Sequence, residues 1–186
     1  MPVTINGTSG ITTPGLDASG TNKFATTIGV GNATPSASGA GVTFPATQSN
    51  STDANTLDDY EEGTYTAAFT IISGSTSATY TRQEGKYTKI GNLVYVTFTI
   101  AWSANTGAGG LVAVNLPFIP STNGPHGGFG TVTYAAGLPV NAMLYGDGGN
   151  AWGVLIRTNS QNSYYGAGDI GAGGGQIMGG FMFTTA

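Results

Sequence analysis

Residues 93–102 alternate strictly between two kinds of side chain, and this segment most constrains the fold. One set of alternate positions is wholly large and apolar: Val94, Val96, Phe98, Ile100 and Trp102. Successive side chains of a β-strand point to opposite faces, so this spacing places one apolar face against a core. A helix would scatter the same residues around its circumference. The segment therefore predicts a half-buried strand.

Similar segments surround it and predict an all-β domain. Tyr65, Ala67, Phe69 and Ile71 indicate one strand with a buried face. Residues 78–83 and 86–90 are expected to be two further strands joined through Glu84 and Gly85, completing a three-stranded meander. Gly91-Asn92 is a two-residue link typical of a type II′ hairpin.

Further short strands are expected downstream. They cover residues 111–116, 130–135, 142–145, 152–158 and 176–184. Their spacing suits a β-sandwich, such as a jelly roll. Since no segment has a helical period, the prediction is a β-sandwich over residues 64–186.

The first 57 residues differ from this pattern, because large apolar side chains are sparse there. Ordering a residue costs about 1–2 kcal/mol of backbone entropy, whereas burying a large side chain returns roughly 1.5–3 kcal/mol. This segment is therefore not expected to fold alone. It is predicted to be an extended attachment stem, ordered by identical copies of itself; a disordered linker is the alternative. Its ten anchors are Val3, Ile5, Ile11, Leu16, Phe24, Ile28, Val30, Val42, Phe44 and Leu57.

Residues 58–63 form an acidic segment between these two parts, interpreted as a linker. It contains Asp58, Asp59, Glu61 and Glu62. Glycosidases need two carboxylates on opposite sides of a substrate, which consecutive positions do not supply. A solvated or interface-capping turn is the favoured interpretation, with Ca²⁺ binding as the alternative, although EF-hand spacing is absent.

Composition excludes several classes of function. Only 8% of residues are charged, and five basic side chains cannot hold a nucleic-acid backbone. With no cysteine and a single histidine, His126, the chain is expected to hold no metal or other cofactor. No nucleophile motif accompanies His126 and no two separated acidic residues suggest a catalytic groove, so the chain is expected to be no enzyme. No apolar run is long enough for membrane insertion, and the N-terminus lacks the pattern of a signal peptide, so synthesis in a cytoplasm is expected.

Aromatic side chains with polar neighbours suggest a binding site in the last third of the chain. Aromatic rings can cover the apolar face of a sugar while amides and carboxylates bind its hydroxyls. The same residues are also common at strand ends and subunit interfaces. The candidate receptor-binding residues are Tyr145, Asp147, Trp152, Tyr164 and Tyr165.

Two motifs resemble tail-fibre and related virion proteins of tailed bacteriophages. Residues 53–65, DANTLDDYEEGTY, resemble the segment that precedes a β-domain in those proteins. Residues 85–96, GKYTKIGNLVYV, resemble their hairpin. The likeness covers residues 1–102 and not the rest, and a collagen-like or coiled-coil shaft and a C-terminal chaperone domain are missing.

The resemblance implies a homotrimeric virion protein, assembled in the host cytoplasm. Its N-terminal part would contact other virion proteins, through Val3, Ile5, Ile11, Leu16 and Phe24. Its C-terminal knob would face the host. We expect a short tail fibre that binds a host-surface polysaccharide by multivalent adhesion. A capsid head fibre, decoration or cement protein with a purely structural role is the alternative, and a depolymerising enzyme is disfavoured.

Overall fold

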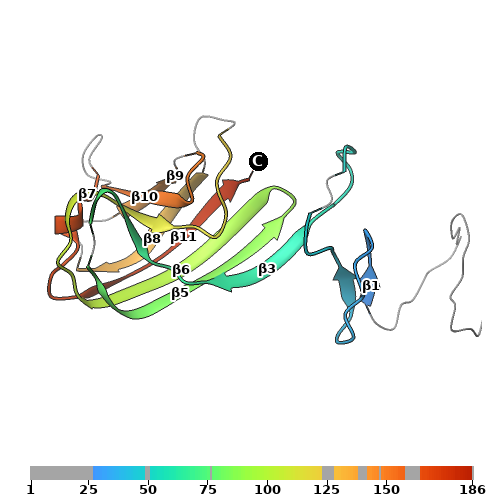
Figure 1. Ribbon diagram of the computed structural model, residues 1–186, viewed down its shortest axis with the longest axis horizontal. Helices are drawn as coiled ribbons and strands as arrows, with labels where there is room; N and C mark the ends of the chain where they lie inside the picture. The colour runs from blue at the N-terminus through green and yellow to red at the C-terminus, as the bar shows by residue number, and fades with distance from the viewer. Residues whose placement is uncertain are drawn as a thin grey trace, which may run out of the picture. The chain divides into compact units, whose positions relative to one another are not determined.

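The chain consists almost wholly of β-strands and connecting loops. The computed structural model describes residues 27–48, 51–75, 77–122, 128–137, 142–146, 148–157 and 164–185. They belong to two compact units, Met1–Pro45 and Ala46–Ala186. Apart from one short 3₁₀ turn, η1 (Ala167–Asp169), every regular element in these ranges is a strand (Figure 1). The all-β prediction is confirmed.

The C-terminal unit contains one nine-stranded sheet in which every pair of neighbours is antiparallel. Its order is β3-β5-β6-β11-β8-β9-β10-β7-β4. The strands are β3 (Tyr60–Tyr65), β4 (Phe69–Ser75), β5 (Thr79–Ile90), β6 (Leu93–Ala104), β7 (Ala108–Asn115), β8 (Gly128–Ala136), β9 (Ala142–Gly146), β10 (Trp152–Arg157) and β11 (Gly175–Thr184).

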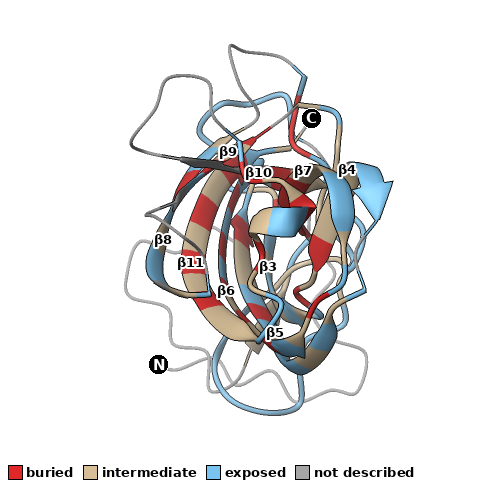
Figure 2. Ribbon diagram, turned by 90° about the vertical axis from the view of Figure 1, so that its left-hand side faces the viewer, coloured by how far each residue is buried: buried red, intermediate tan, exposed pale blue. Residues whose placement is uncertain are grey.

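The sheet is curled, because its two edge strands are consecutive in the chain. Only residues 66–68 separate β3 at one edge from β4 at the other. Hydrogen bonds join the start of β4 to β5: the Phe69 amide donates to the Tyr80 hydroxyl at 3.0 Å, and Gln83 Nε2 donates to the Ala67 carbonyl at 3.2 Å. Figures 1 and 2 show the resulting curved sheet, and Figure 2 shows the buried residues along its strands.

The core lies inside this curl. The apolar face of β6 is buried as predicted, from Val94 through Trp102. It packs with side chains from β4, β7 and β11, among them Phe69, whose ring meets that of Trp102 edge to face at 5.1 Å. Tyr165 and Ile170, beside η1, complete the same cluster. Burial of these side chains is the main source of stability for such a unit.

Two strand predictions need correction. Residues 65–71 are not one strand, because the chain leaves β3 after Tyr65 and begins β4 at Phe69 on the opposite edge of the sheet. Residues 79–90 are one strand rather than two, so β5 and β6 form a hairpin and not part of a three-stranded meander. The turn at Gly91 is confirmed, with the φ of 56° that the first central residue of a type II′ turn requires.

The N-terminal unit contains a small parallel pair, β1 (Thr27–Gly29) and β2 (Gly41–Thr43). Ile28 lies opposite Val42, and Val42 is 51% exposed. Two strands of three residues are too short to be stable alone. The predicted anchors Val3, Ile5, Ile11, Leu16 and Phe24 lie outside the described residues.

Candidate functional site

Of the aromatic residues that the sequence grouped together, the structure places Tyr145 and Trp152 near each other on the paired strands β9 and β10, and it buries Tyr165. Tyr165 is fully buried in the core, which leaves no surface on its ring for a ligand. Tyr164 is 41% exposed, and Trp152, at the start of β10, is half-buried. Tyr145 lies on β9, directly opposite Phe129 of β8. Asp147 lies outside the described residues.

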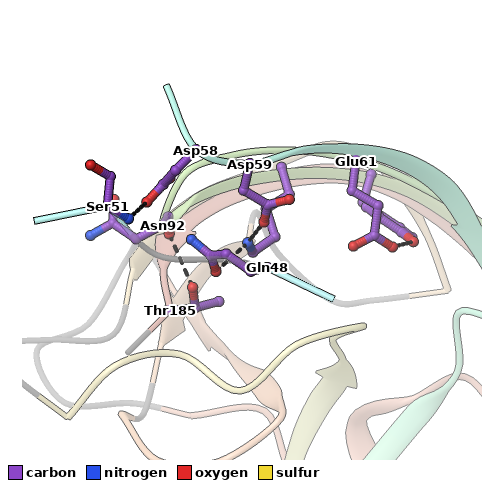
Figure 3. A network of polar contacts seen from close by, with 9 residues as sticks. Gln48, Ser51, Asp58, Asp59, Glu61, Asn92 and Thr185 are labelled. Carbon is purple, nitrogen blue, oxygen red and sulfur yellow. Dashed lines mark hydrogen bonds and ion pairs between the residues drawn. The ribbon is translucent and has the colours of Figure 1, made fainter. Parts of the chain in front are cut away.

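The acidic segment predicted as a linker forms much of an edge strand. Tyr60–Tyr65 pairs with β5 in continuous register, from Tyr60 opposite Ile90 to Tyr65 opposite Gly85. The two motifs on which the family resemblance rests are therefore neighbours in one sheet. Their residues meet in a polar network at this edge (Figure 3).

A buried ion pair lies at the centre of this network. Lys89 Nζ contacts the Asp59 carboxylate, and only 7% of each side chain is exposed. Lys89 Nζ also donates to Gln48 Oε1 at 3.2 Å. In Figure 3, Asp59 and Gln48 lie side by side, with Asp58 beyond Asp59 and bound to the Ser51 amide at 2.8 Å. Since removing one partner would leave a buried charge, this pair fastens Asp59 to the hairpin, and the same Lys89 ammonium holds Gln48.

Two tyrosines on β3 and β5 each lie over a glycine of the other strand. Gly63 is opposite Tyr87, and Tyr65 is opposite Gly85. A Cβ at Gly85 would lie 2.3 Å from Tyr65 Cε1, and one at Gly63 would lie 2.5 Å from Tyr87 Cζ. Both glycines are therefore required for close packing of the rings. The Tyr87 hydroxyl also donates to Glu61, and this hydrogen bond, with burial, raises the pKa of Tyr87 to about 12.

These contacts give the acidic cluster a structural role. Asp58, Asp59, Glu61 and Glu62 have partners in Ser51, Lys89, Tyr87 and Tyr60 respectively. Among the described residues, no group of three or more acidic or histidine side chains could hold a metal ion. The arrangement fastens the edge strand, and it offers no pair of carboxylates across a groove.

The outward face of the sheet carries a second, more exposed group of side chains. One row runs across four strands from Tyr95 of β6 through Met182 and Phe129 to Tyr145, each directly opposite the next. Tyr95 is 52% exposed and Phe129 is 64% exposed. Parallel to this row, Thr97 lies opposite Gly180, and Gly180 lies opposite Thr131.

These two rows border a groove of about 500 Å³ over β6, β11 and β8. Gly180 has no side chain to fill it, and the Tyr95 ring leans across that position: a Cβ there would lie 3.1 Å from the tyrosine oxygen. Hydroxyl groups of Thr97, Thr99, Thr131 and Thr133 line the groove, and none of its lining residues is charged. Thr133 donates to the Met178 carbonyl at 3.3 Å.

An adjoining groove of about 480 Å³ continues over β3 and β5. It shares Tyr95 and Thr97 with the first groove and adds Glu62 and Lys86. The outward face is thus hollowed on both sides of Tyr95. The charged groups lie on one side only.

Sequence reasoning missed this face. A sequence pattern that points to this face was present in residues 93–102. Tyr95, Thr97 and Thr99 alternate there with the buried apolar residues, and they therefore face outward. An aromatic residue next to threonines on an outward face suggests contact with something other than water. Phe129, however, lies in a segment with no comparable pattern, and only the pairing of β8 with β11 brings it near Tyr95.

We found no match for this chain among protein-family models, curated proteins or solved structures. Within the described ranges, no helix is long and apolar enough to cross a membrane.

Proposed function

We propose that this chain is a non-enzymatic structural protein of a virion, a short tail fibre that attaches the particle to a host-surface glycan. The observation that carries the proposal is the pairing of the two tail-fibre-like motifs along β3 and β5. Residues from both motifs also form the Asp59–Lys89 ion pair and the Glu61–Tyr87 hydrogen bond. The two motifs thus form one structural element, the β5–β6 hairpin and the edge strand β3 paired with it.

The C-terminal unit serves as the knob in this proposal. Its curled sheet encloses a core to which strands from both ends of the strand order contribute, including β4, β7, β6 and β11. Such an arrangement supports a jelly-roll-like sandwich. The exposed groove between Tyr95 and Phe129 supports a binding role.

The N-terminal unit serves as the stem. Ile28 and Val42 lie opposite each other on the pair β1–β2, and Val30 directly follows β1. Val30 and Val42 are 38% and 51% exposed. In a homotrimer, sister chains would cover these exposed apolar side chains, and their exposure therefore supports this assembly. Three weak binding sites in one trimer would act together through a high effective concentration. Val3, Ile5, Ile11, Leu16 and Phe24 are the proposed contacts to other virion proteins.

The test locates the protein on the virion and measures whether the purified protein competes with virions for host cells. Antibody against the purified full chain should label the tail of the virion in electron microscopy, and the protein should inhibit adsorption of virions to host cells. Labelling of the capsid shell without such inhibition would favour a head fibre or cement protein instead. Light scattering at micromolar concentration should give the mass of a trimer, and a monodisperse monomer would contradict the stem.

A further inference from the structure

We infer that the groove over β6, β11 and β8 is a binding site for a neutral saccharide, in which Tyr95 and Phe129 contact the sugar rings. The inference rests on the proposed adhesion function and goes beyond it. It assigns a location, a ligand charge and a mode of contact to the site.

Two rings on the outward face provide the apolar contacts. Tyr95 and Phe129 lie on strands β6 and β8, on opposite sides of β11, and both are opposite Met182. Each ring is more than half exposed. A pyranose ring has an apolar face of C–H groups, and an exposed aromatic ring buries that face without needing a polar partner.

Hydroxyl groups in the rows beside the rings provide the polar contacts. Within the described part of the chain, the side chains of Thr97, Thr99 and Thr131 make no hydrogen bond. Each hydroxyl can both donate and accept, as sugar hydroxyls can. All three threonines line the groove. Gly180 contributes no side chain between Thr97 and Thr131, and the Tyr95 ring leans over that position beside them.

The absence of charge in the lining selects a neutral ligand. An acidic polysaccharide would need cations to offset the cost of desolvating its carboxylates or sulfates. The lining has none. Of the nearest cations, Lys86 lies opposite Thr97 and lines the adjoining groove together with Glu62, and Arg82 is paired with Glu84. A neutral hexose chain carries no such requirement.

The hollow also favours a saccharide over a second protein chain. Protein interfaces are centred on tightly packed, interdigitating side chains. Here the centre of the face is lined by Gly179 and Gly180, and its volume of about 500 Å³ falls in the range of small-ligand sites. A flat sugar ring fits over this floor, beside the row in which Met182 separates Tyr95 from Phe129.

The experiment measures sugar binding to the purified full chain. The probes are neutral hexasaccharides of glucose, galactose, mannose, rhamnose and N-acetylglucosamine, with oligogalacturonate as the acidic comparison. Saturation-transfer NMR detects binding, and calorimetry gives the dissociation constant. At least one neutral probe should bind, with transfer to its ring C–H protons, and oligogalacturonate should not.

Three variants test the location. Phe129→Ala and Tyr95→Ala should each weaken binding by about tenfold or more, because each removes a stacking surface. Thr131→Val keeps the shape and removes one hydroxyl, and it should weaken binding roughly threefold to tenfold. Ile119→Ala is the matched control, since Ile119 is 58% exposed and does not line the groove. Circular dichroism checks that every variant is folded.

The outcomes separate the inference from the function on which it rests. Unchanged binding in all three variants would overturn this location while leaving glycan adhesion intact. Binding of oligogalacturonate alone, or of no probe by the unaltered protein, would overturn the neutral saccharide. A third outcome is that the unaltered chain binds no sugar and that Phe129→Ala lowers the mass of the oligomer. It would identify the face as a subunit interface and would also overturn the inference.

Discussion

Lys89 on β5 and Asp59, the residue before β3, form an ion pair from which water is almost wholly excluded, with 7% of each side chain exposed. The Asp59 carbonyl also accepts a hydrogen bond from the Gly91 amide at 3.0 Å. One residue thus contacts both a strand and the turn of the same hairpin. These contacts hold Asp59, just before β3, against the β5–β6 hairpin.

The ion pair gives the first prediction. Lys89→Met should lower the free energy of unfolding by about 3–5 kcal/mol, because it leaves the Asp59 carboxylate buried without its partner. The double variant Asp59→Leu with Lys89→Met should recover most of that loss. Urea denaturation measures both changes.

A matched control exists for this measurement. Arg82 and Glu84 form an ion pair on the same strand, with side chains 50% and 59% exposed. Glu84→Gln should leave the urea midpoint unchanged, since water screens such a pair. Equal losses for Lys89→Met and Glu84→Gln would show that burial does not matter here.

The rings over glycines give the second prediction. Gly85→Ala should destabilise the protein by about 1–3 kcal/mol, because the added Cβ would lie 2.3 Å from Tyr65 Cε1 and must displace the ring. Gly173→Ala is the control, since a Cβ there meets nothing within 4 Å. If thermal unfolding shows equal shifts for both variants, ring displacement is not the cause.

Alkaline pH gives the third prediction. The hydrogen bond to Glu61 and burial raise the pKa of Tyr87 from 10.0 to about 12. The unfolded chain loses the Tyr87 proton first, so this stabilisation is complete below pH 10 and is lost as the pH rises through about 12.

The variant Tyr87→Phe tests this assignment. It should reduce the slope of stability against pH between about 10 and 12. Some slope should persist, because burial also raises the pKa of Tyr65. Urea midpoints at intervals across this range provide the measurement, and an unchanged slope would contradict the role of Tyr87.

Asn115, at the end of β7, gives the fourth prediction. Its Oδ1 accepts from the Ala68 amide at 2.7 Å, and its Nδ2 donates to the Thr66 carbonyl at 2.9 Å. Asn115→Ala should cost about 1–3 kcal/mol and speed hydrogen exchange at Ala68, because the connection between the two edge strands loses both bonds. Asn115→Asp keeps the acceptor and should preserve protection at Ala68. Slow exchange in the alanine variant would argue against this role.

The sequence by itself determined that the C-terminal unit is built of strands, and it determined the buried face of β6. Strict alternation from Val94 to Trp102 is a local property, and it survives in any sheet that covers one face. The sequence did not determine which strands are neighbours in the sheet. The continuous alternation from Tyr65 to Ile71 concealed the break between β3 and β4, because residues on both edges of a curled sheet face the same core.

Tertiary structure decided the candidate site. Tyr165 looked available in the sequence, but the core encloses it, whereas Phe129 and Tyr95 become parts of one groove because β11 lies between their strands. Likewise, the acidic segment looked like a solvated linker until pairing with β5 placed Asp59 on Lys89 and Glu61 on Tyr87. Local pattern fixes which way a side chain faces, but contacts between distant segments decide what it meets.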